Sequence, residues 1–404
     1  MSLTTDLIAL EQQYGANNYE PIPVVLNRGE GVYVWDVEGK RYYDFLSGIC
    51  AVSQGHCHPH IVKALTDQAK QLTLVSRAFY SDAFGEFAQA ATAYFGFERI
   101  LVMNTGVEAV ETAMKLCRKW GYEKKGIPDG QAKIVVCSGN FHGRTLAAVS
   151  AGVAPDAKSP FAPLLPGFVM IPFNDLPALI QALRDPQVAG FLVEPIQGEG
   201  GVVVPGAGYL KSAFELCRAA NVLFLADEVQ TGIGRTGRRL ACDHEGVHPD
   251  ILILGKALSG GMFPISAILA DNAVMSAFRP GDHGSTFGGN PLACRVAKAA
   301  LEVVQREELP QRAEAMGELF RAELQGIRPD LVAEVRGKGL LNAVVFHQDR
   351  GIKAWDICLT LRDHGLLAKN TRDHIIRFAP PLVIDRPQML EAIGIVKRVL
   401  SELA

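Results

Sequence analysis

Short apolar runs without polar alternation recur along this 404-residue chain, and they constrain its fold more than any other feature. Such runs are typical of strands that are buried on both faces of a parallel sheet. Helical patterns lie between them, as in residues 107–120, where apolar side chains recur at a spacing of three to four. The alternation predicts a doubly wound α/β domain with its ligand site beyond the carboxyl ends of the strands. The clearest runs are residues 133–137, 190–193, 222–226 and 250–254.

The pattern changes beyond residue 290. Residues 292–325 have the charge and spacing of long helices, and short strands are predicted near 340–346 and 375–378. A last helix over 386–403 follows Asp385, a plausible N-cap. This change favours a smaller α+β domain at the C-terminal end. We therefore expect an N-terminal segment (residues 1–50), a large domain (51–290) and a small domain (291–404).

Composition excludes several classes of function. The chain is 48% hydrophobic and 21% charged with a formal net charge of -3, so it lacks the basic excess that binds nucleic acid. Residues 1–14 lack the pattern of a signal peptide, and no apolar run approaches the roughly 18 residues of a membrane span. Eight cysteines without CxxC spacing are expected to be reduced. These features predict a cytoplasmic protein that binds neither nucleic acid nor membranes.

Two successive buried runs end in residues that can carry chemistry. Asp227 follows the run 222–226, and Lys256 follows the run 250–254. Pyridoxal phosphate requires such a pair, because a lysine bonds its aldehyde and a carboxylate keeps its pyridine nitrogen protonated. The same two residues could equally be a helix N-cap and a surface lysine.

A small turn, residues 104–107, lies between the apolar run 100–103 and the helix that is predicted from Val107. Backbone N–H groups at the start of a helix bind phosphate well, so this turn is a candidate phosphate cradle. Strand-turn-helix junctions with glycine are common, and the turn gains weight only together with Asp227 and Lys256.

Two other motifs point to different functions. Gly232, Gly234 and Gly237 spell the dinucleotide fingerprint GxGxxG, but the residues after Gly237 are too broken for the required helix. The cluster His56, Cys57, His58 and His60 lies within one short segment with no second cluster to complete a tetrahedral set. We therefore expect neither a nucleotide nor a metal site.

The sequence AspGluValGln at Asp227, followed by GlyLysAlaLeu around Lys256 (256 − 227 = 29 positions later), resembles the class III aminotransferases. The resemblance runs nearly end to end. Within the class, the chain is most similar to the ornithine aminotransferase branch, on segments such as GlyHisCysHisPro at Gly55, MetAsnThrGlyValGluAla at Met103 and GluProIleGlnGlyGlu at Glu194. This resemblance implies a fold type I pyridoxal-phosphate enzyme with a mostly parallel central sheet, active as a homodimer.

The resemblance also implies roles for the cofactor residues. Lys256 would hold the cofactor and move protons, and Asp227 would pair with its pyridine nitrogen. Phe141 would stack on its ring and Gln230 would bond its phenolic oxygen. Gly106 and Val107 would bind the phosphate, with Ser285 and Thr286 reaching in from the second subunit. The remaining residues expected around the cofactor are Thr105, His142, Glu194 and Val229.

For the substrates, the resemblance places Tyr19 and Arg144 on the α-carboxylate side of ornithine, so that the distal amine reacts. Arg377 would bind the α-carboxylate of 2-oxoglutarate, and Glu199 would pair with Arg377 while ornithine is bound. Ile49 stands near the substrate, where the branch usually carries tyrosine.

The implied reaction converts L-ornithine and 2-oxoglutarate to glutamate 5-semialdehyde, which cyclises to pyrroline-5-carboxylate, and glutamate. The alternative within the same chemistry is another ω-aminotransferase, acting on acetylornithine or 4-aminobutyrate, which Ile49 favours. His142 replaces a usual tryptophan. A nucleotide-dependent oxidoreductase and a non-catalytic relative are disfavoured, the latter because Lys256 and Asp227 are both present.

Overall fold

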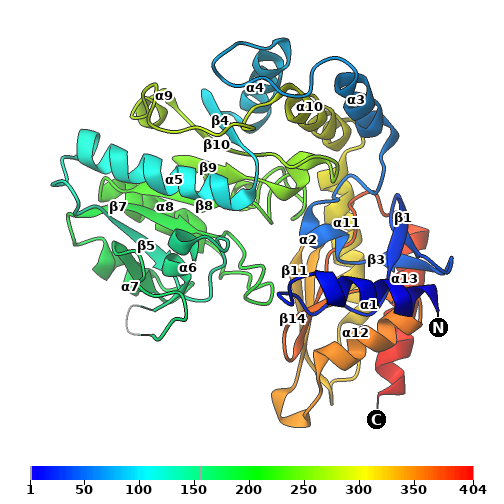
Figure 1. The fold of residues 1–404 in the computed structure, drawn as a ribbon. Coiled ribbons are helices and arrows are strands. Elements are labelled where there is room, and N and C mark those ends of the chain that lie inside the picture. Colours follow the sequence, from blue (N-terminus) through cyan, green and yellow to red (C-terminus); the bar gives the residue numbers. More distant parts are fainter. Residues whose placement is uncertain (1, 155–156, 404) are drawn as a thin grey trace.

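A computed structural model of the protein describes residues 2–154 and 157–403 (Figure 1). Its central sheet has seven strands in the order β4-β10-β9-β8-β7-β5-β6. β10 is antiparallel to both of its neighbours, and all the other pairs are parallel. The prediction of a mostly parallel sheet is confirmed. The strands are β4 (Arg99–Met103), β5 (Lys133–Cys137), β6 (Phe168–Ile171), β7 (Val188–Val193), β8 (Leu223–Asp227), β9 (Ile251–Leu254) and β10 (Ser266–Ala270).

Helices cover both faces of this sheet, which is why its central strands show no polar alternation. On β8, Leu223 and Leu225 share a cluster with α5, whereas Phe224 and Ala226 share one with α8. Every residue of β7, β8 and β9 is buried. The helices are α5 (Gly106–Trp120), α6 (Leu146–Gly152), α7 (Leu176–Ala182), α8 (Tyr209–Ala219), α9 (Asn272–Met275) and the short helices η1 (Gly121–Lys125), η2 (Cys242–Glu245) and η3 (Lys256–Ser259).

The C-terminal part contains a second, antiparallel sheet in the order β11-β12-β15-β14. Asp385 caps the last helix as predicted, and its side chain accepts a hydrogen bond from the backbone of Gln388. The strands are β11 (Val332–Lys338), β12 (Leu341–Phe346), β14 (Lys369–Arg372) and β15 (Ile375–Phe378), and the helices are α10 (Pro291–Arg306), α11 (Leu309–Leu324), η4 (Gln348–Arg350), α12 (Ala354–Asp363) and α13 (Arg386–Glu402).

The predicted helical stretch 292–325 is two helices, α10 and α11. They are separated at Glu308, whose φ of 51° is left-handed, and Pro310 lies at the start of α11. α10 packs against α3 (Pro59–Ala69) and α4 (Asp82–Phe95), as Figure 1 shows. α10 begins the predicted small domain, whereas α3 and α4 belong to the predicted large domain. Because these helices pack together, the division of the chain at residue 290 stays a prediction.

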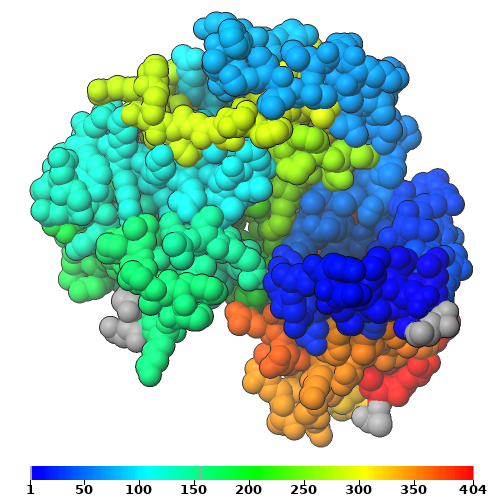
Figure 2. Space-filling view, viewed as in Figure 1, coloured from blue at the N-terminus to red at the C-terminus, as the bar shows by residue number. Residues whose placement is uncertain are grey.

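The N-terminal part forms a third sheet, in the order β1-β2-β3-β13, whose last strand comes from far along the chain. Figure 2 shows the helix α1 on the surface, beside a hollow that separates it from the cyan and green segment. The elements are α1 (Leu3–Tyr14), β1 (Leu26–Glu30), β2 (Tyr33–Asp36), β3 (Arg41–Asp44), α2 (Ser47–Cys50) and β13 (Leu366–Leu367). Across the described residues, no helix combines the length and the apolar character that crossing a bilayer requires.

Candidate active site

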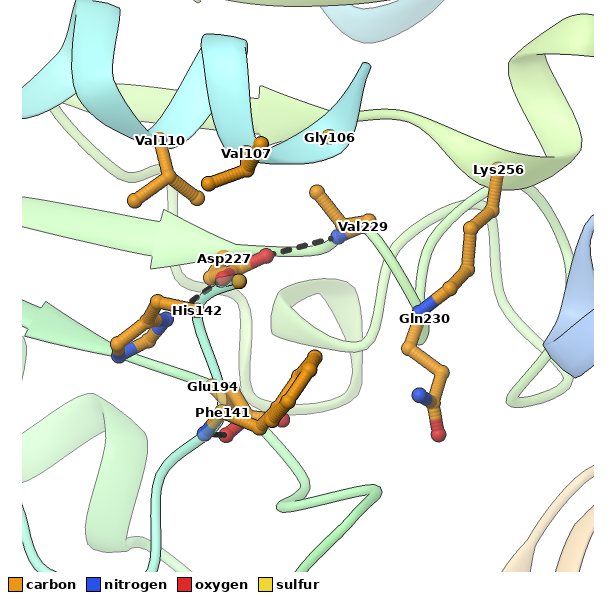
Figure 3. Close-up of a pocket in the computed structure, with 11 residues that line it drawn as sticks. Gly106, Val107, Val110, Phe141, His142, Glu194, Asp227, Val229, Gln230 and Lys256 are labelled. Atoms are coloured by element: carbon orange, nitrogen blue, oxygen red, sulfur yellow. Dashed lines mark hydrogen bonds and ion pairs between the residues drawn. The ribbon is translucent and has the colours of Figure 1, made fainter. Parts of the chain in front are cut away.

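The carboxyl ends of β4, β5, β7, β8 and β9 lie at one edge of the central sheet and surround a cavity (Figure 3). Nine of the twelve residues predicted to contact the cofactor line this cavity. Thr105 lines an adjoining cavity that also includes Gly106 and Lys256, whereas Ser285 and Thr286 line neither. The residues around the main cavity are Gly106, Val107, Val110, Phe141, His142, Gly143, Glu194, Asp227, Val229, Gln230 and Lys256.

Asp227 is buried at the end of β8 and is held in place from two sides. Its Oδ2 lies 2.7 Å from Nδ1 of His142, and its Oδ1 accepts a hydrogen bond of 3.1 Å from the backbone N–H of Val229. Burial lowers the pKa of His142, but the hydrogen bond and charge of Asp227 outweigh this effect and raise the pKa above its usual value. The pair therefore places a fixed carboxylate in the wall of the cavity.

Glu194 follows β7 and lies behind Phe141. Its carboxylate accepts hydrogen bonds from the backbone N–H groups of Phe141 at 2.8 Å and Gly198 at 3.2 Å. Burial raises the pKa of Glu194 to about 7, and the charge of Asp227 adds to this increase. Glu194 thus positions the loop that carries Phe141. The second carboxylate near it is that of Asp227.

Lys256 begins the short helix η3, directly beyond β9, with a left-handed φ of 39°. A non-glycine residue in this conformation is strained and persists only where its surroundings hold it. Figure 3 shows its side chain extending toward Gln230, on the opposite side of the cavity from His142 and Asp227. The carboxylate and the amine that were recognised from the sequence therefore face one cavity from two sides.

The start of α5 can bind an anion. Thr105 and Glu108 form a capping box, so Glu108 occupies the N–H groups of Asn104 and Thr105. Among the described residues, the N–H groups of Gly106 and Val107 have no acceptor, and the helix dipole adds positive potential there. Gly143 allows the loop after β5 to approach the start of α5 closely, because a Cβ at this position would lie 2.3 Å from Cγ2 of Val107.

These features fit pyridoxal phosphate. The free N–H groups at the start of α5 suit its phosphate, the Asp227 carboxylate suits its protonated ring nitrogen, and Lys256 suits its aldehyde. Phe141, which is 37% exposed, offers an aromatic face between them.

An ion pair joins the cavity to the C-terminal sheet. Nη1 of Arg377, on β15, lies 2.6 Å from Oε1 of Glu199 and 3.0 Å from Oε1 of Gln230. Nε2 of Gln230 donates to the same oxygen of Glu199 at 3.2 Å. Arg377 is buried. Burial raises the pKa of Glu199, but the charge of Arg377 outweighs it and holds the pKa below its usual value.

None of the five predicted substrate residues lines the cavity itself, and Glu199 and Arg377 hydrogen-bond to a residue that does, Gln230. Tyr19 is 70% exposed in the segment after α1, and the Arg144 guanidinium lies 5.6 Å from the centroid of the Phe141 ring. Ile49 belongs to α2, a turn in which four consecutive residues have positive φ. Ser285 accepts a hydrogen bond of 2.8 Å from the side chain of Asn104.

The other motifs have structural explanations. Gly234 and Gly237 adopt positive φ in a buried loop, and no α-helix follows before β9. The three histidines each contact a carboxylate, His56 with Asp44, His58 with Glu307 and His60 with Glu302. Within the described residues, no group of three or more metal-ligating side chains converges.

Val110 and Gly143 line the cavity although the sequence did not identify them as site residues. Val110 belongs to the apolar face of α5, which looks the same whether it packs in the core or faces a ligand. Gly143 follows Phe141 and His142 directly, and this adjacency was the available signal.

Comparison with known proteins gives a consistent result. The family model of class-III aminotransferases matches residues 14–400. The mitochondrial ornithine aminotransferase of Drosophila ananassae is 58% identical over 402 residues, which is 100% of this chain and 93% of the relative. The crystal structure of ornithine aminotransferase from Toxoplasma gondii superposes with a TM-score of 0.96 at 49% identity, covering 99% of this chain and 96% of the other. An acetylornithine aminotransferase from Elizabethkingia anophelis superposes with a TM-score of 0.90 at 53% identity, covering 100% of both chains.

The prediction of a cytoplasmic location is wrong. The relatives from two Drosophila species and from rat are named as mitochondrial enzymes, which contradicts that prediction. A second structure of the Toxoplasma gondii enzyme is described with pyridoxal phosphate at its active site. The chain belongs to the class-III aminotransferase family, and pyridoxal phosphate is its cofactor.

Proposed function

We propose that this protein is an ornithine δ-aminotransferase that transfers the distal amino group of L-ornithine to 2-oxoglutarate. The observation that carries the proposal is the ion pair of 2.6 Å between the buried Arg377 and the half-buried Glu199, next to the cavity residue Gln230. The names of the relatives from Drosophila and rat, 56% to 59% identical over nearly the whole chain, support the same substrate.

In this proposal the cofactor acts as an electron sink for the carbon that loses its proton. Lys256 would hold the cofactor through its Nζ and would move that proton as a general acid-base group. Asp227 would keep the cofactor's ring nitrogen protonated, with its carboxylate fixed in direction by His142. Gly106 and Val107 would bind the phosphate through their backbone N–H groups, Phe141 would stack on the ring, and Gln230 would bond the phenolic oxygen.

The ion pair explains how one site accepts two different substrates. With Glu199 on Arg377, the guanidinium is neutralised and attracts no carboxylate, so the α-carboxylate of ornithine binds farther out, near Tyr19 and Arg144. This placement brings the distal amine to the cofactor. For 2-oxoglutarate, Glu199 releases Arg377, which binds the α-carboxylate as a bidentate fork while Arg144 binds the distal one.

We also propose that the active form is a homodimer and that Ser285 and Thr286 of one subunit complete the phosphate site of the other. Two observations support this. Neither residue lines the cavity of its own chain, and α1 has no buried residue within a single chain. The division into segments 1–50, 51–290 and 291–404 is part of the same proposal.

A second candidate is a related ω-aminotransferase that acts on acetylornithine or 4-aminobutyrate. The likeness to the acetylornithine aminotransferase from Elizabethkingia anophelis, together with Ile49, favours this candidate.

The two candidates are separated by the absorbance of the holoenzyme between about 300 and 500 nm, titrated separately with L-ornithine, N-acetylornithine and 4-aminobutyrate. Bleaching of the cofactor band by ornithine at far lower concentration than by the others supports the first candidate. Equal or better bleaching by either of the others refutes it in favour of the second. If no band forms with added pyridoxal phosphate, both candidates are wrong.

A further inference from the structure

Arg235 is a fully buried arginine that contacts no carboxylate among the described residues. Its guanidinium donates instead to four neutral oxygens: Pro380 O at 2.6 Å, Ser53 Oγ at 2.9 Å, Leu340 O at 3.0 Å and Ser47 Oγ at 3.4 Å. A buried charge without a counter-ion is costly unless hydrogen bonds replace its hydration. The positions of those four oxygens indicate which part of the chain the buried guanidinium holds in place.

Two of these contacts hold the chain directly after Arg377. Pro380, the nearest acceptor, is three residues beyond Arg377. Ser47, which accepts from Arg235, also donates its hydroxyl to Ala379 O at 2.6 Å. Two consecutive carbonyl groups after β15 are therefore bound by Arg235 and by one of its partners.

The turn that carries Ser47 is strained. Ser47, Ile49 and Cys50 have φ of 44°, 57° and 69°, and Gly48 between them has 58°. The left-handed conformation is unfavourable for a non-glycine residue, because its Cβ crowds the following carbonyl oxygen. The contacts of Ser47 with Ala379 and Arg235 help to hold this turn, which presents Ile49.

We propose that Arg235 is a positioning residue: through Pro380, and through Ser47 and Ala379, it fixes Arg377 where that guanidinium can exchange Glu199 for the α-carboxylate of the oxo acid. This inference rests on the proposed function of Arg377. Arg235 itself is fully buried and does not line the cavity, so it acts through the backbone and not by contact with the substrate.

The first test is Arg235→Lys, which keeps the charge but offers one nitrogen in place of a planar fork directed at four oxygens. The readout is the exchange of labelled 2-oxoglutarate into L-glutamate, which does not involve ornithine. We expect the KM for 2-oxoglutarate to rise roughly ten- to hundredfold, as misplacement of a binding group does. The KM for L-ornithine should stay within about twofold, because Arg377 does not bind ornithine. The cofactor absorbance should not change.

Two buried serines provide a matched pair in case Arg235→Lys does not fold. Ser47→Ala and Ser53→Ala each remove a hydroxyl that Arg235 contacts, but only the Ser47 hydroxyl binds the chain after Arg377, whereas that of Ser53 donates to Cys50 O. The backbone bond between Ser53 O and the N–H of Leu382 is kept in both variants. We expect Ser47→Ala to raise the KM for 2-oxoglutarate clearly more than Ser53→Ala does.

A purely structural role for Arg235 makes a different prediction. In that case Arg235→Lys would lower the melting temperature and leave the KM values for 2-oxoglutarate and L-ornithine unchanged, or raise both equally. Either result would overturn the proposal. Equal effects of the two serine variants would overturn it as well. Failure of the wild-type enzyme to use ornithine, with the exchange reaction intact, would reject the ornithine assignment but leave this test in place.

Discussion

Glu199→Gln removes the charge that neutralises Arg377 while keeping the size of the side chain. Arg377 is 2% exposed, and the side chain of Glu199 is 30% exposed, so the ion pair is only partly screened by water. Truncating one partner of a buried charge pair costs about 2–5 kcal/mol. Because Glu199 is partly exposed, we expect the change in binding free energy to lie near the lower limit of this range. A change of ~2 kcal/mol corresponds to a factor of about thirty in the affinity of Arg377 for a substrate carboxylate.

The variant should therefore favour substrates that place a carboxylate on Arg377. We expect single-turnover bleaching of the cofactor band by L-glutamate to reach half-saturation at roughly thirtyfold lower concentration. Bleaching by L-ornithine should become less efficient, because the free guanidinium attracts its α-carboxylate and moves the distal amine away from the cofactor. The ratio of the two efficiencies is the measured quantity.

Glu314→Gln is the control, because Glu314 forms an ion pair with Arg238 at 2.9 Å, and neither residue lines the cavity. This variant should leave the ratio unchanged. If Glu199→Gln also leaves the ratio of glutamate to ornithine efficiency unchanged, the assignment of Glu199 and Arg377 as the element that selects between the substrates is refuted.

Three further predictions follow from the site. Lys256→Ala should reduce turnover by roughly 10⁴-fold or more, as expected for loss of both cofactor attachment and proton transfer, while circular dichroism shows a native fold; turnover within tenfold of wild type would exclude Lys256 as the general acid-base group. Folding raises the pKa of Glu194 from 4.5 to about 7, so the folded protein binds this proton more tightly than the unfolded chain does. Protonation of Glu194 therefore stabilises the fold fully below pH 4.5, and this stabilisation is lost as the pH rises through 7. In denaturant titrations the wild type should lose stability relative to Glu194→Gln across that interval, and parallel curves would disprove this. Gly143→Ala places a Cβ 2.3 Å from Val107 at a φ of 128°, so it should lower the free energy of unfolding by about 1–3 kcal/mol and weaken cofactor binding. The control Gly85→Ala, at an exposed position in α4 with no atom within 4 Å of the new Cβ, should not destabilise the protein. Equal melting temperatures for the two variants would contradict the close approach of Gly143 to Val107.

The sequence by itself predicted a mostly parallel central sheet and located several of its strands with their carboxyl ends, but not the strand order or the antiparallel strand β10. Strands that are buried on both faces cannot alternate with polar residues, so their apolar runs are visible without any tertiary information. The residues that end those runs were visible too, and because parallel strands share one carboxyl edge, Asp227 and Lys256 could be placed at one site. The capping residue Asp385 fixed where the last helix begins, because capping is local chemistry.

Tertiary structure alone decided what depends on contacts between distant segments. The histidine at position 142 became a partner of Asp227 only when the loop after β5 met the end of β8. The ion pair of Glu199 with Arg377 joins residues that are 178 positions apart, and resemblance, not spacing, suggested it. Arg235 belongs to a misleading glycine motif, and only the folded chain brings three separate segments around its side chain. A long-range contact leaves no periodic trace in the sequence, because it depends on where the chain returns and not on how it repeats.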